Sequence, residues 1–450
     1  MSAQSLGEQT VDLLGRLVRL GCVNDLTADS GGEERAANLL EDFFAGLPVS
    51  IERITPHPGR TSLVVTVEGA DPRSAGTPLT LLGHTDVVPV DEAKWTHDPF
   101  GAHIEGDVMW GRGTVDMLHL TAAMAVVTRE VARRAQEGNP PARSLVFVAA
   151  ADEEARGGLG VPWIGERRAD ALPWDAALSE MGGAHIRGRR GGDNVVVVVG
   201  EKGAAQRRLH IRGDAGHGSV PLGRTSAVER LSQVSAALSA ARWPTATDEV
   251  WASFVRAFEF DETTETSLIN GTYEGDYTEF EDLAAFAHAI SHVTVAQTVA
   301  RSGGPINVMP SHATLELDIR TLPGVDDDDV DAAIMAALGD LAEHVTIERL
   351  LCEAATASSI DTDLYRAIEA ALTKRYPGAS VVPVLFPGGS DLRVARRRGG
   401  IGYGFGAVDS GASLGQVYSQ LHAHDEHIAL VDVRATAEVL HEVATTYLGA

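Results

Sequence analysis

The sequence predicts an α/β protein built around a mostly parallel sheet, with a smaller α+β domain inserted into it. Short apolar runs bounded by Gly, Pro or Asp alternate with helical patterns through roughly the first 200 residues, which is the order expected of strand–helix units. From about Glu201 onward the strand-like runs alternate polar and apolar residues, as strands with one solvent-facing side do. With 450 residues, the chain is long enough for two or three domains.

Four apolar runs in the first part are short enough to be buried strands. They are 62–68, 78–83, 144–151 and 176–179. Helical patterns accompany them over 11–18, as an amphipathic segment, and over 119–136. Ligands of parallel α/β sheets bind beyond the carboxyl ends of the strands, so the residues that follow each run are candidates for a site.

The middle of the chain predicts a different unit. Its predicted strands are 205–213, 313–320 and 344–350, and its helical patterns are 225–241 and 326–342. An order of strand–helix–strand–strand–helix–strand resembles a ferredoxin-like module inserted into the α/β domain. The acidic stretch 259–282 is expected to be an irregular insertion within it, and helical and strand patterns resume from residue 361.

Composition and charge exclude several classes of function. With 63 acidic against 37 basic residues, the formal net charge is −26, whereas a nucleic-acid backbone needs a basic face. The cysteines, Cys22 and Cys352, are far apart in the chain, which argues against a disulfide scaffold and a thiolate zinc site. No run of about 18 apolar residues occurs, so we expect no membrane span. The N-terminus lacks a basic segment followed by an apolar run, and we therefore expect a cytoplasmic protein.

Potential metal ligands follow three of the predicted strands. The strand ends deliver five such residues: His84, Asp86, Glu153, Glu154 and Glu180. An aspartate close to a metal-bound histidine can accept a hydrogen bond from the second ring nitrogen and so orient the ring. For the adjacent glutamates the alternative is a pair of solvated charges at a strand end, and partners elsewhere in the chain decide between the two interpretations.

Two further residues extend this set. Asp116 stands at the start of a predicted helix, where it is either an N-cap or a carboxylate that bridges two cations. His422 lies in the run HAHDEH near the end of the chain. Together these residues offer nitrogen and oxygen donors without thiolates, a set that suits Zn²⁺, Co²⁺ or Mn²⁺.

Motifs along the chain occur in the order found in the M20 family of metallopeptidases, which the sequence resembles from about residue 10 to its end. They are GHTDVVP, GRGTVDM, DEE, SEMGG, GHGSVP, INVMP with LDIR, GGSDLR and HAHDE. The family includes carboxypeptidase S-like peptidases, glutamate carboxypeptidase, succinyl-diaminopimelate desuccinylase, acetylornithine deacetylase and aminoacylases. The resemblance implies a catalytic α/β domain with a dinuclear zinc site and a smaller lid domain. The implied boundaries are 1–202 and 353–450 for the two parts of the catalytic domain and 203–352 for the inserted lid and dimerisation domain.

The resemblance also implies the metal ligands. One zinc ion takes His84 and Glu180, and the other takes Glu154 and His422. Asp116 bridges the two ions. Co²⁺ or Mn²⁺ can replace Zn²⁺ with such donors.

Catalytic and substrate-binding roles follow from the same resemblance. Asp86 orients His84, and Glu153 is the general base that activates water and protonates the leaving amine. His217 stabilises the oxyanion, in relatives often from the second subunit of a dimer. The groups implied to hold the carboxylate of the substrate are Asn307, Arg320, Gly389 and Ser390.

Some residues depart from the family pattern. Leu118 and His119 stand where Lys and Gly are usual, Met181 stands where Gly is usual, and His424 is an extra histidine within its motif. We expect a changed pocket beside the bridging carboxylate, with metal binding retained. A second histidine pair, His288 and His292, has the spacing of a helical metal pair, but no carboxylate partner is evident and an exposed helix face is favoured.

The leading hypothesis is a dinuclear zinc hydrolase that cleaves the amide bond of a peptide with a free carboxylate. The forms SEMGG and HAHDE favour the carboxypeptidase S and dipeptidase-like branch. One alternative is an N-acyl-amino-acid deacylase of the acetylornithine or desuccinylase kind. Another is an inactive binding protein that retains the fold, which the presence of all five implied ligands and Glu153 disfavours. The expected partners are a small substrate and a second copy of the chain through the lid domain, with neither nucleic acid nor membrane.

Overall fold

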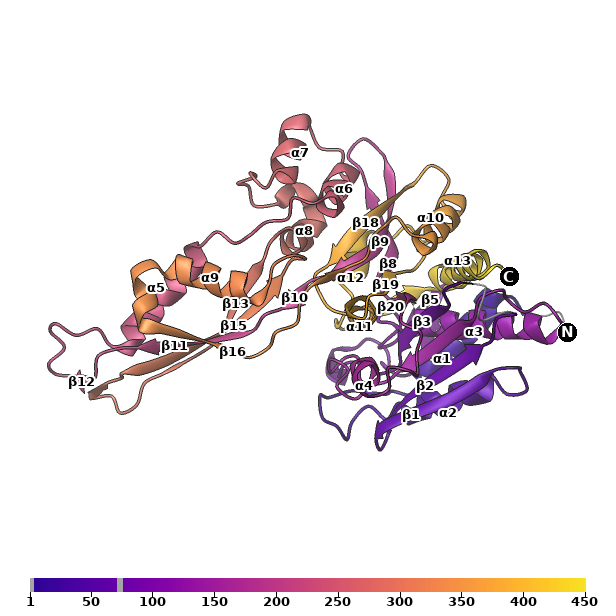
Figure 1. Ribbon diagram of the computed structural model, residues 1–450, viewed down its shortest axis with the longest axis horizontal. Coiled ribbons are helices and arrows are strands. Elements are labelled where there is room, and N and C mark those ends of the chain that lie inside the picture. Colours follow the sequence, from indigo (N-terminus) through magenta and orange to yellow (C-terminus); the bar gives the residue numbers. More distant parts are fainter. Residues whose placement is uncertain (1–3, 71–75) are drawn as a thin grey trace.

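The computed structural model describes residues 4–70 and 76–450 and has two parts, a broad sheet domain and an elongated extension (Figure 1). Both α1 and α13, from opposite ends of the chain, belong to the sheet domain, while the middle of the chain forms the extension. The predicted class, an α/β domain with an inserted α+β unit, is confirmed. No helix of the described residues is long and apolar enough to cross a membrane.

A ten-stranded sheet is the scaffold of the larger part. Its order is β1-β2-β6-β3-β7-β19-β9-β17, and β8 and β18 also pair with β9. The strands are β1 (Ser50–His57), β2 (Arg60–Val67), β3 (Leu79–His84), β6 (Leu145–Ala150), β7 (Ala176–Ser179), β8 (Gly182–Arg187), β9 (Asp193–Glu201), β17 (Thr356–Ala357), β18 (Ser380–Phe386) and β19 (Ile401–Gly404). The middle strands β6, β3, β7 and β19 run parallel, so their carboxyl ends meet at one edge. The strands predicted in the first part of the chain are confirmed as β2, β3, β6 and β7.

Helices cover both faces of this sheet because side chains alternate along each strand. On β2, Leu63 and Val65 belong to one core and Val64 to the other. The first core is covered by α1 (Leu6–Val18), α2 (Glu34–Phe43), α3 (Leu118–Gln136), α10 (Asp363–Arg375) and α13 (Leu430–Leu448). The second is covered by α4 (Val161–Arg167) and α11 (Leu392–Arg397). The predicted helices over 11–18 and 119–136 are thus confirmed as parts of α1 and α3.

A small antiparallel sheet joins distant parts of the chain. It consists of β4 (His103–Glu105), β5 (Val108–Trp110) and β20 (His427–Ala429), in the order β20-β5-β4. Two short helices lie near it in the chain, η1 (Glu92–Lys94) and α12 (Leu414–Tyr418). This sheet brings the loop before α3 next to the segment before α13.

The extension contains an antiparallel sheet with the strand order β16-β11-β15-β13, to which β10 is added beside β15. Its strands are β10 (Gly203–Ala204), β11 (Arg207–Arg212), β13 (Thr294–Ser302), β15 (His312–Thr321) and β16 (Val345–Arg349). The helices α5 (Ala227–Ala240) and α9 (Asp327–Leu338) pack on it, and η3 (Gly339–His344) follows α9. This is the predicted ferredoxin-like arrangement. At its far end, β12 (Gly216–His217) pairs with β14 (Val308–Met309) (Figure 1).

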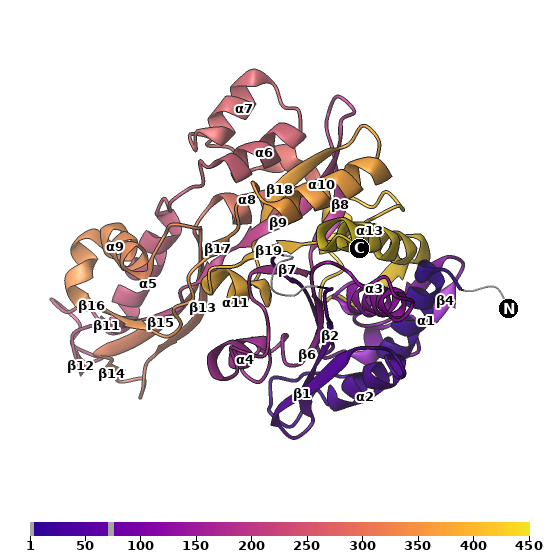
Figure 2. The same cartoon turned by 45° about the vertical axis from the view of Figure 1, so that its right-hand side comes forward.

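The prediction that 259–282 is irregular is wrong. The segment contains α7 (Glu262–Ile269) and most of η2 (Thr278–Leu283), between α6 (Glu249–Ala257) and α8 (Ala284–Ser291). These helices share an aromatic core whose rings include Trp251, Phe254, Phe258, Phe260 and Phe280. Figure 2 shows α6 next to β18, so these helices cover the end of the large sheet.

Candidate metal centre

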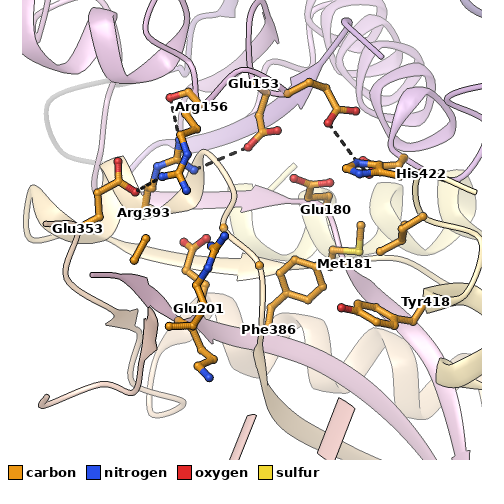
Figure 3. Close-up of a pocket in the computed structure, with 18 of the residues that line it drawn as sticks. Glu153, Arg156, Glu180, Met181, Glu201, Glu353, Phe386, Arg393, Tyr418 and His422 are labelled. Atoms are coloured by element: carbon orange, nitrogen blue, oxygen red, sulfur yellow. Dashed lines mark hydrogen bonds and ion pairs between the residues drawn. The ribbon is translucent and has the colours of Figure 1, made fainter. Parts of the chain in front are cut away.

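The candidate ligands converge at the carboxyl edge of the parallel strands. His84 is the last residue of β3 and is paired in register with Ala150, the last residue of β6. Glu153 and Glu154 follow β6, and Glu180 follows β7 directly. Figure 3 shows Glu153, Glu180 and His422 around one cavity. The structure therefore brings together side chains that the sequence places up to several hundred residues apart.

Asp116 lies between the two histidines. Its Oδ1 is 3.2 Å from Nε2 of His84, and its Oδ2 is 3.4 Å from Nε2 of His422. Glu180 lies on the first side, with Oε2 3.8 Å from Nε2 of His84. Glu154 lies on the second side, with Oε2 3.2 Å from Nε2 of His422. Each oxygen of one carboxylate thus faces a different imidazole–glutamate pair, which is the arrangement that a bridging ligand requires.

Burial and mutual repulsion shift the pKa values of these groups in a consistent pattern. Burial, together with repulsion from Asp116, raises the pKa of Glu154 to about 8. Contacts with Asp116 and Glu154 raise the pKa of His422 to about 10. Glu180 has a pKa well above its usual value, because of burial first and the charge of Asp116 second. Several carboxylates that cannot easily all be ionised together are a strong site for divalent cations, which would supply the missing positive charge.

Glu153 has a separate environment. Its pKa is raised to about 7 by burial, against the favourable charges of His84 and Arg393. The guanidinium of Arg393 lies 3.7 Å from its Oε1, and a dashed line in Figure 3 marks this ion pair. A carboxylate that is buried, near a metal site and titrates near neutral pH is suited to proton transfer.

Asp86 contacts His84 differently from the sequence expectation. The Nδ1 atom of His84 is 2.9 Å from the main-chain oxygen of Asp86 and 3.6 Å from its carboxylate. The carboxylate instead accepts hydrogen bonds from Nδ2 of Asn24 and from the backbone N–H groups of Glu153 and Glu154. Asp86 therefore orients the histidine through its backbone and holds the two glutamates through its side chain.

Basic groups line the same cavity as the candidate metal ligands, and the cavity has a volume of about 440 Å³. Its cationic lining residues are Arg156, Lys202, Arg320, Arg393 and Arg397. Of the expected substrate-binding residues, Arg320 and Gly389 line this cavity. Ser390 is buried beside it, and its N–H donates to the carboxylate of Glu201. Arg320 is held by Asp318, with Nε 2.7 Å from Oδ1.

The other two expected residues lie elsewhere. His217 and Asn307 are at the far end of the extension, where the N–H of Gly218 donates to the carbonyl of Asn307. His217 is exposed, and its Nδ1 is 2.8 Å from the hydroxyl of Ser219. Within the described residues, neither lines the cavity.

Two residues that shape the site, Glu426 and Arg393, were not among those predicted from the sequence. Glu426 is fully buried and accepts hydrogen bonds from the N–H groups of Gly113, Val115 and Asp116 and from Arg112. Arg393 lies in the basic run RVARRR (393–398) and is buried, with its guanidinium facing Glu153. The sequence signal for Arg393 was its position in the motif GGSDLR, and that for Glu426 was its position in the motif HAHDE.

A second, apolar cavity of about 210 Å³ adjoins the first and shares Glu180 and Met181 with it. Its lining includes His119, Phe405, Val408, Val417 and Ile428. Burial lowers the pKa of His119 to about 4, so this imidazole is neutral at pH 7. Two of the residues that depart from the family pattern, His119 and Met181, thus form part of this pocket.

Comparison with known proteins places this geometry in a family. The family model described as peptidase family M20/M25/M40 matches residues 80–446. A probable carboxypeptidase S-like protein of Dictyostelium discoideum is 27% identical over 349 residues, which are 74% of this chain and 64% of that protein. The succinyl-diaminopimelate desuccinylase of Gluconobacter oxydans is 34% identical over 166 residues, 36% of this chain and 40% of that protein. Each match spans less than two thirds of the relative's own length.

A solved structure agrees with the fold. An M20 family metallo-carboxypeptidase from Sulfolobus solfataricus superposes with a TM-score of 0.69 at 19% identity, covering 98% of this chain and 100% of that one. At this identity the likeness shows the fold. Because the family model covers most of the sequence, the conclusion does not depend on the structural likeness alone: the chain belongs to peptidase family M20/M25/M40.

Proposed function

We propose that this protein is a dinuclear zinc-dependent hydrolase that cleaves the amide bond of a small peptide with a free carboxylate. The observation that carries the proposal is the position of Asp116 between His84 and His422, with Glu153 beside them. Membership of a peptidase family and the carboxypeptidase S-like relative support the reaction class. The donors are nitrogen and oxygen atoms without thiolates, which fits Zn²⁺ and also Co²⁺ or Mn²⁺.

The distances support the ligand sets that the family resemblance implies. One ion would be held by His84 and Glu180, the other by Glu154 and His422, and both by Asp116. When bound, two divalent ions activate water and polarise the amide carbonyl. The expected base, Glu153, takes the proton of that water and delivers it to the leaving amine. Arg393 keeps Glu153 directed into the cavity.

The basic side of the cavity supports a substrate with a free carboxylate. Arg320 presents a guanidinium that can bind a carboxylate with two hydrogen bonds, and Lys202 lies in the same cavity wall. The backbone at Gly389 is the other expected contact, and Ser390 supports it by its bond to Glu201. We assign the adjoining apolar cavity to an apolar side chain of the substrate.

We further propose a homodimer in which His217 and Asn307 complete the cavity of the partner subunit. Both residues lie at the exposed far end of the extension, away from the cavity of their own chain. Large apolar side chains are exposed around them, at Val220, Leu222, Ile306 and Val308. Such a patch favours burial against another protein surface. Both cysteines are free, which fits the expected cytoplasmic location.

The test is metal-dependent hydrolysis of a defined substrate panel. Protein stripped with a chelator and reloaded with Zn²⁺ would be assayed on dipeptides, on the same dipeptides as C-terminal amides, and on N-acyl amino acids. We expect two zinc ions per chain, activity only in the reloaded protein, and a marked preference for the free carboxylate. Bound zinc without turnover of any substrate would instead support the alternative of an inactive binding protein.

The second candidate function is an N-acyl-amino-acid deacylase. The 34% identity to a succinyl-diaminopimelate desuccinylase favours it, although that match covers 36% of this chain. The two functions share the metal centre and the carboxylate contacts, and differ in the acyl group that is released. Faster cleavage of N-acyl amino acids than of dipeptides in the same panel would establish the deacylase.

A further inference from the structure

A second cluster of metal-binding side chains lies outside the cavity. It consists of His97, His103 and Glu105, and one ligand atom from each lies within 4.8 Å of the others. His97 is partly buried, while His103 and Glu105 are exposed. None of these residues lines the catalytic cavity or the apolar cavity. The proposed hydrolase reaction gives them no role.

The local fold aims these side chains at one point. His103 and Glu105 are two residues apart on β4, so they project from the same face of the strand. His103 lies opposite Trp110 in the register of β4 and β5. His97 comes from the preceding loop and stacks on His103, with ring centroids 4.2 Å apart. Its Nε2 is 3.6 Å from Oε2 of Glu105.

Aromatic packing supports the position of His97. Trp110 stacks on His427 of β20, with centroids 4.4 Å apart, and its ring is 5.2 Å from that of His97. Within the described residues, no hydrogen bond engages the ring nitrogens of His103, so they are free to bind a ligand. The two imidazoles are thus held close together by stacking, with Glu105 beside His97.

We propose that His97, His103 and Glu105 form a third divalent transition-metal site, separate from the dinuclear centre and open to solvent. Two imidazoles and a carboxylate suit Zn²⁺, Ni²⁺ or Cu²⁺, whereas Ca²⁺ and Mg²⁺ prefer sites made of oxygen. With three protein ligands, a fourth position stays open for water. Ligands of one zinc ion lie about 2 Å from it, so the side chains must close in and the stacked rings of His97 and His103 must turn until a nitrogen of each points to the ion. The exposure of His103 and Glu105 permits this.

The site is connected to the loop that carries His422. Thr96, next to His97, donates from its N–H to Oδ1 of Asp425 over 2.7 Å and from its hydroxyl to Oδ2 over 2.9 Å. A metal ion bound to His97 would therefore tie the 95–97 loop to β4 and, through Asp425, restrain the loop after His422. Occupancy would stabilise the folded protein according to the concentration of free metal.

The experiment measures metal binding to the full-length protein whose dinuclear centre is already loaded with Zn²⁺. After removal of unbound metal, Zn²⁺ binding would be titrated by calorimetry. Ni²⁺ binding would be followed by quenching of the tryptophan fluorescence, to which Trp110 contributes. We expect one further equivalent of Zn²⁺ and quenching by Ni²⁺. Both signals should weaken at least tenfold in His103→Ala and in Glu105→Gln, while hydrolysis without added metal stays at the wild-type rate.

Two controls make the result specific. His57→Ala removes another histidine near a carboxylate, since His57 is 3.6 Å from Asp29, and should leave both signals unchanged. Trp110→Phe should weaken the quenching, because Trp95 and the other tryptophans remain, but keep the calorimetric equivalent. If Ni²⁺ exchanges into the dinuclear centre, it does so in His103→Ala as well as in wild type. The difference in signal between the two proteins therefore reports the proposed site alone. A further equivalent that binds His103→Ala as tightly as wild type, or no further equivalent in wild type, would overturn the proposal.

Discussion

Glu153 and Glu154 are neighbours in the chain, but their carboxylates contact different groups. Glu154 lies 3.2 Å from His422, whereas Glu153 faces Arg393 at 3.7 Å. Asp86 makes this possible, because it accepts a hydrogen bond from the N–H of each glutamate and fixes the backbone between them. The same side chain at adjacent positions can therefore serve as a base at one and a metal ligand at the other.

Matched substitutions of these two glutamates test that division of roles. We expect Glu153→Gln to keep both metal ions and to lose about 10²- to 10⁴-fold in kcat, because the amide cannot accept the proton. Glu154→Gln should weaken metal binding by more than about tenfold and recover activity when excess Zn²⁺ is added. Metal content and kcat at several zinc concentrations would be measured for both. Equal loss of metal in the two variants would contradict the assignment.

At the scale of an element, Glu426 organises the turn that presents Asp116. Its two carboxylate oxygens accept three backbone N–H groups of residues 113–116 and the guanidinium of Arg112. Burial raises the pKa of Glu426, and the charge of Arg112 opposes that shift. A buried N–H group without a partner costs about 1–3 kcal/mol. The turn therefore depends on the carboxylate of Glu426 to satisfy these donors.

Glu426→Gln should therefore weaken metal binding, although Glu426 is not itself a candidate ligand. The amide offers one oxygen in place of two and turns an N–H group toward backbone donors. We expect zinc affinity to fall about 10- to 100-fold, measured by competition with a chromogenic chelator, together with a lower melting temperature. Glu438→Gln, at an exposed position on α13 that pairs with Arg375, is the control for the same chemical change away from the centre. Wild-type zinc affinity in Glu426→Gln would show that the turn is held by other contacts.

A histidine pair lies at the end of helix α8: His288 is in its last turn and His292 follows its last residue. The rings of His288 and His292 stack with centroids 4.4 Å apart, and Tyr277 contacts both edge-on. Burial, together with the charges of His288 and Lys202, lowers the pKa of His292 to about 4. The pKa of His288 is also lowered, by burial and by Lys202. His288 is exposed, whereas His292 is partly buried and follows the last residue of α8, so the pair only partly matches the exposed helix face that was expected from the sequence.

These histidines should make stability depend on pH. A folded-state pKa below that of the unfolded chain means that the unfolded chain binds more protons, so their contribution is intact above about pH 6.5 and is lost as the pH falls toward about 4. We expect the melting temperature of wild type to fall more between pH 7 and pH 5 than that of His288→Asn/His292→Asn. Both proteins lose metal with acid, so the difference between them isolates the pair. Parallel curves for the two proteins would contradict the prediction.

At the scale of the whole molecule, the elements that could be predicted are those that depend on the residues of their own segment. The strands β3, β6 and β7 could be predicted because each is a short apolar run, and their carboxyl ends located the site. The helices around 259–282 were missed although Asp248 and Asp261 are N-caps, because the aromatic core that orders them joins residues from Trp251 to Phe286. The contact of Glu426 with residues more than 300 positions away had no local signal either.

His217 does not line the cavity of its own chain. The sequence places it in a motif expected to act on the substrate, yet it lies in β12, at the far end of the extension. A closing motion of the extension and a second subunit are two ways to bring it to a cavity. The exposed apolar side chains around it, including Leu222 and Ile306, favour a second subunit because a monomer would leave them in water.

Complementation between two inactive variants distinguishes these explanations. His217→Ala keeps Glu153 but lacks the histidine, and Glu153→Gln keeps the histidine but lacks the base. In a mixed dimer the cavity of the first variant would receive His217 from the second, so that one of its two cavities is complete. Equal co-expression makes half of the dimers mixed, and about a quarter of all cavities should then be active. Separate tags on the two chains would allow the mixed dimer to be purified, and its rate per chain should reach about half that of wild type. If His217 acts within its own chain, the mixed dimer stays as inactive as the parents, and if His217→Ala alone is fully active, the histidine has no role in the reaction.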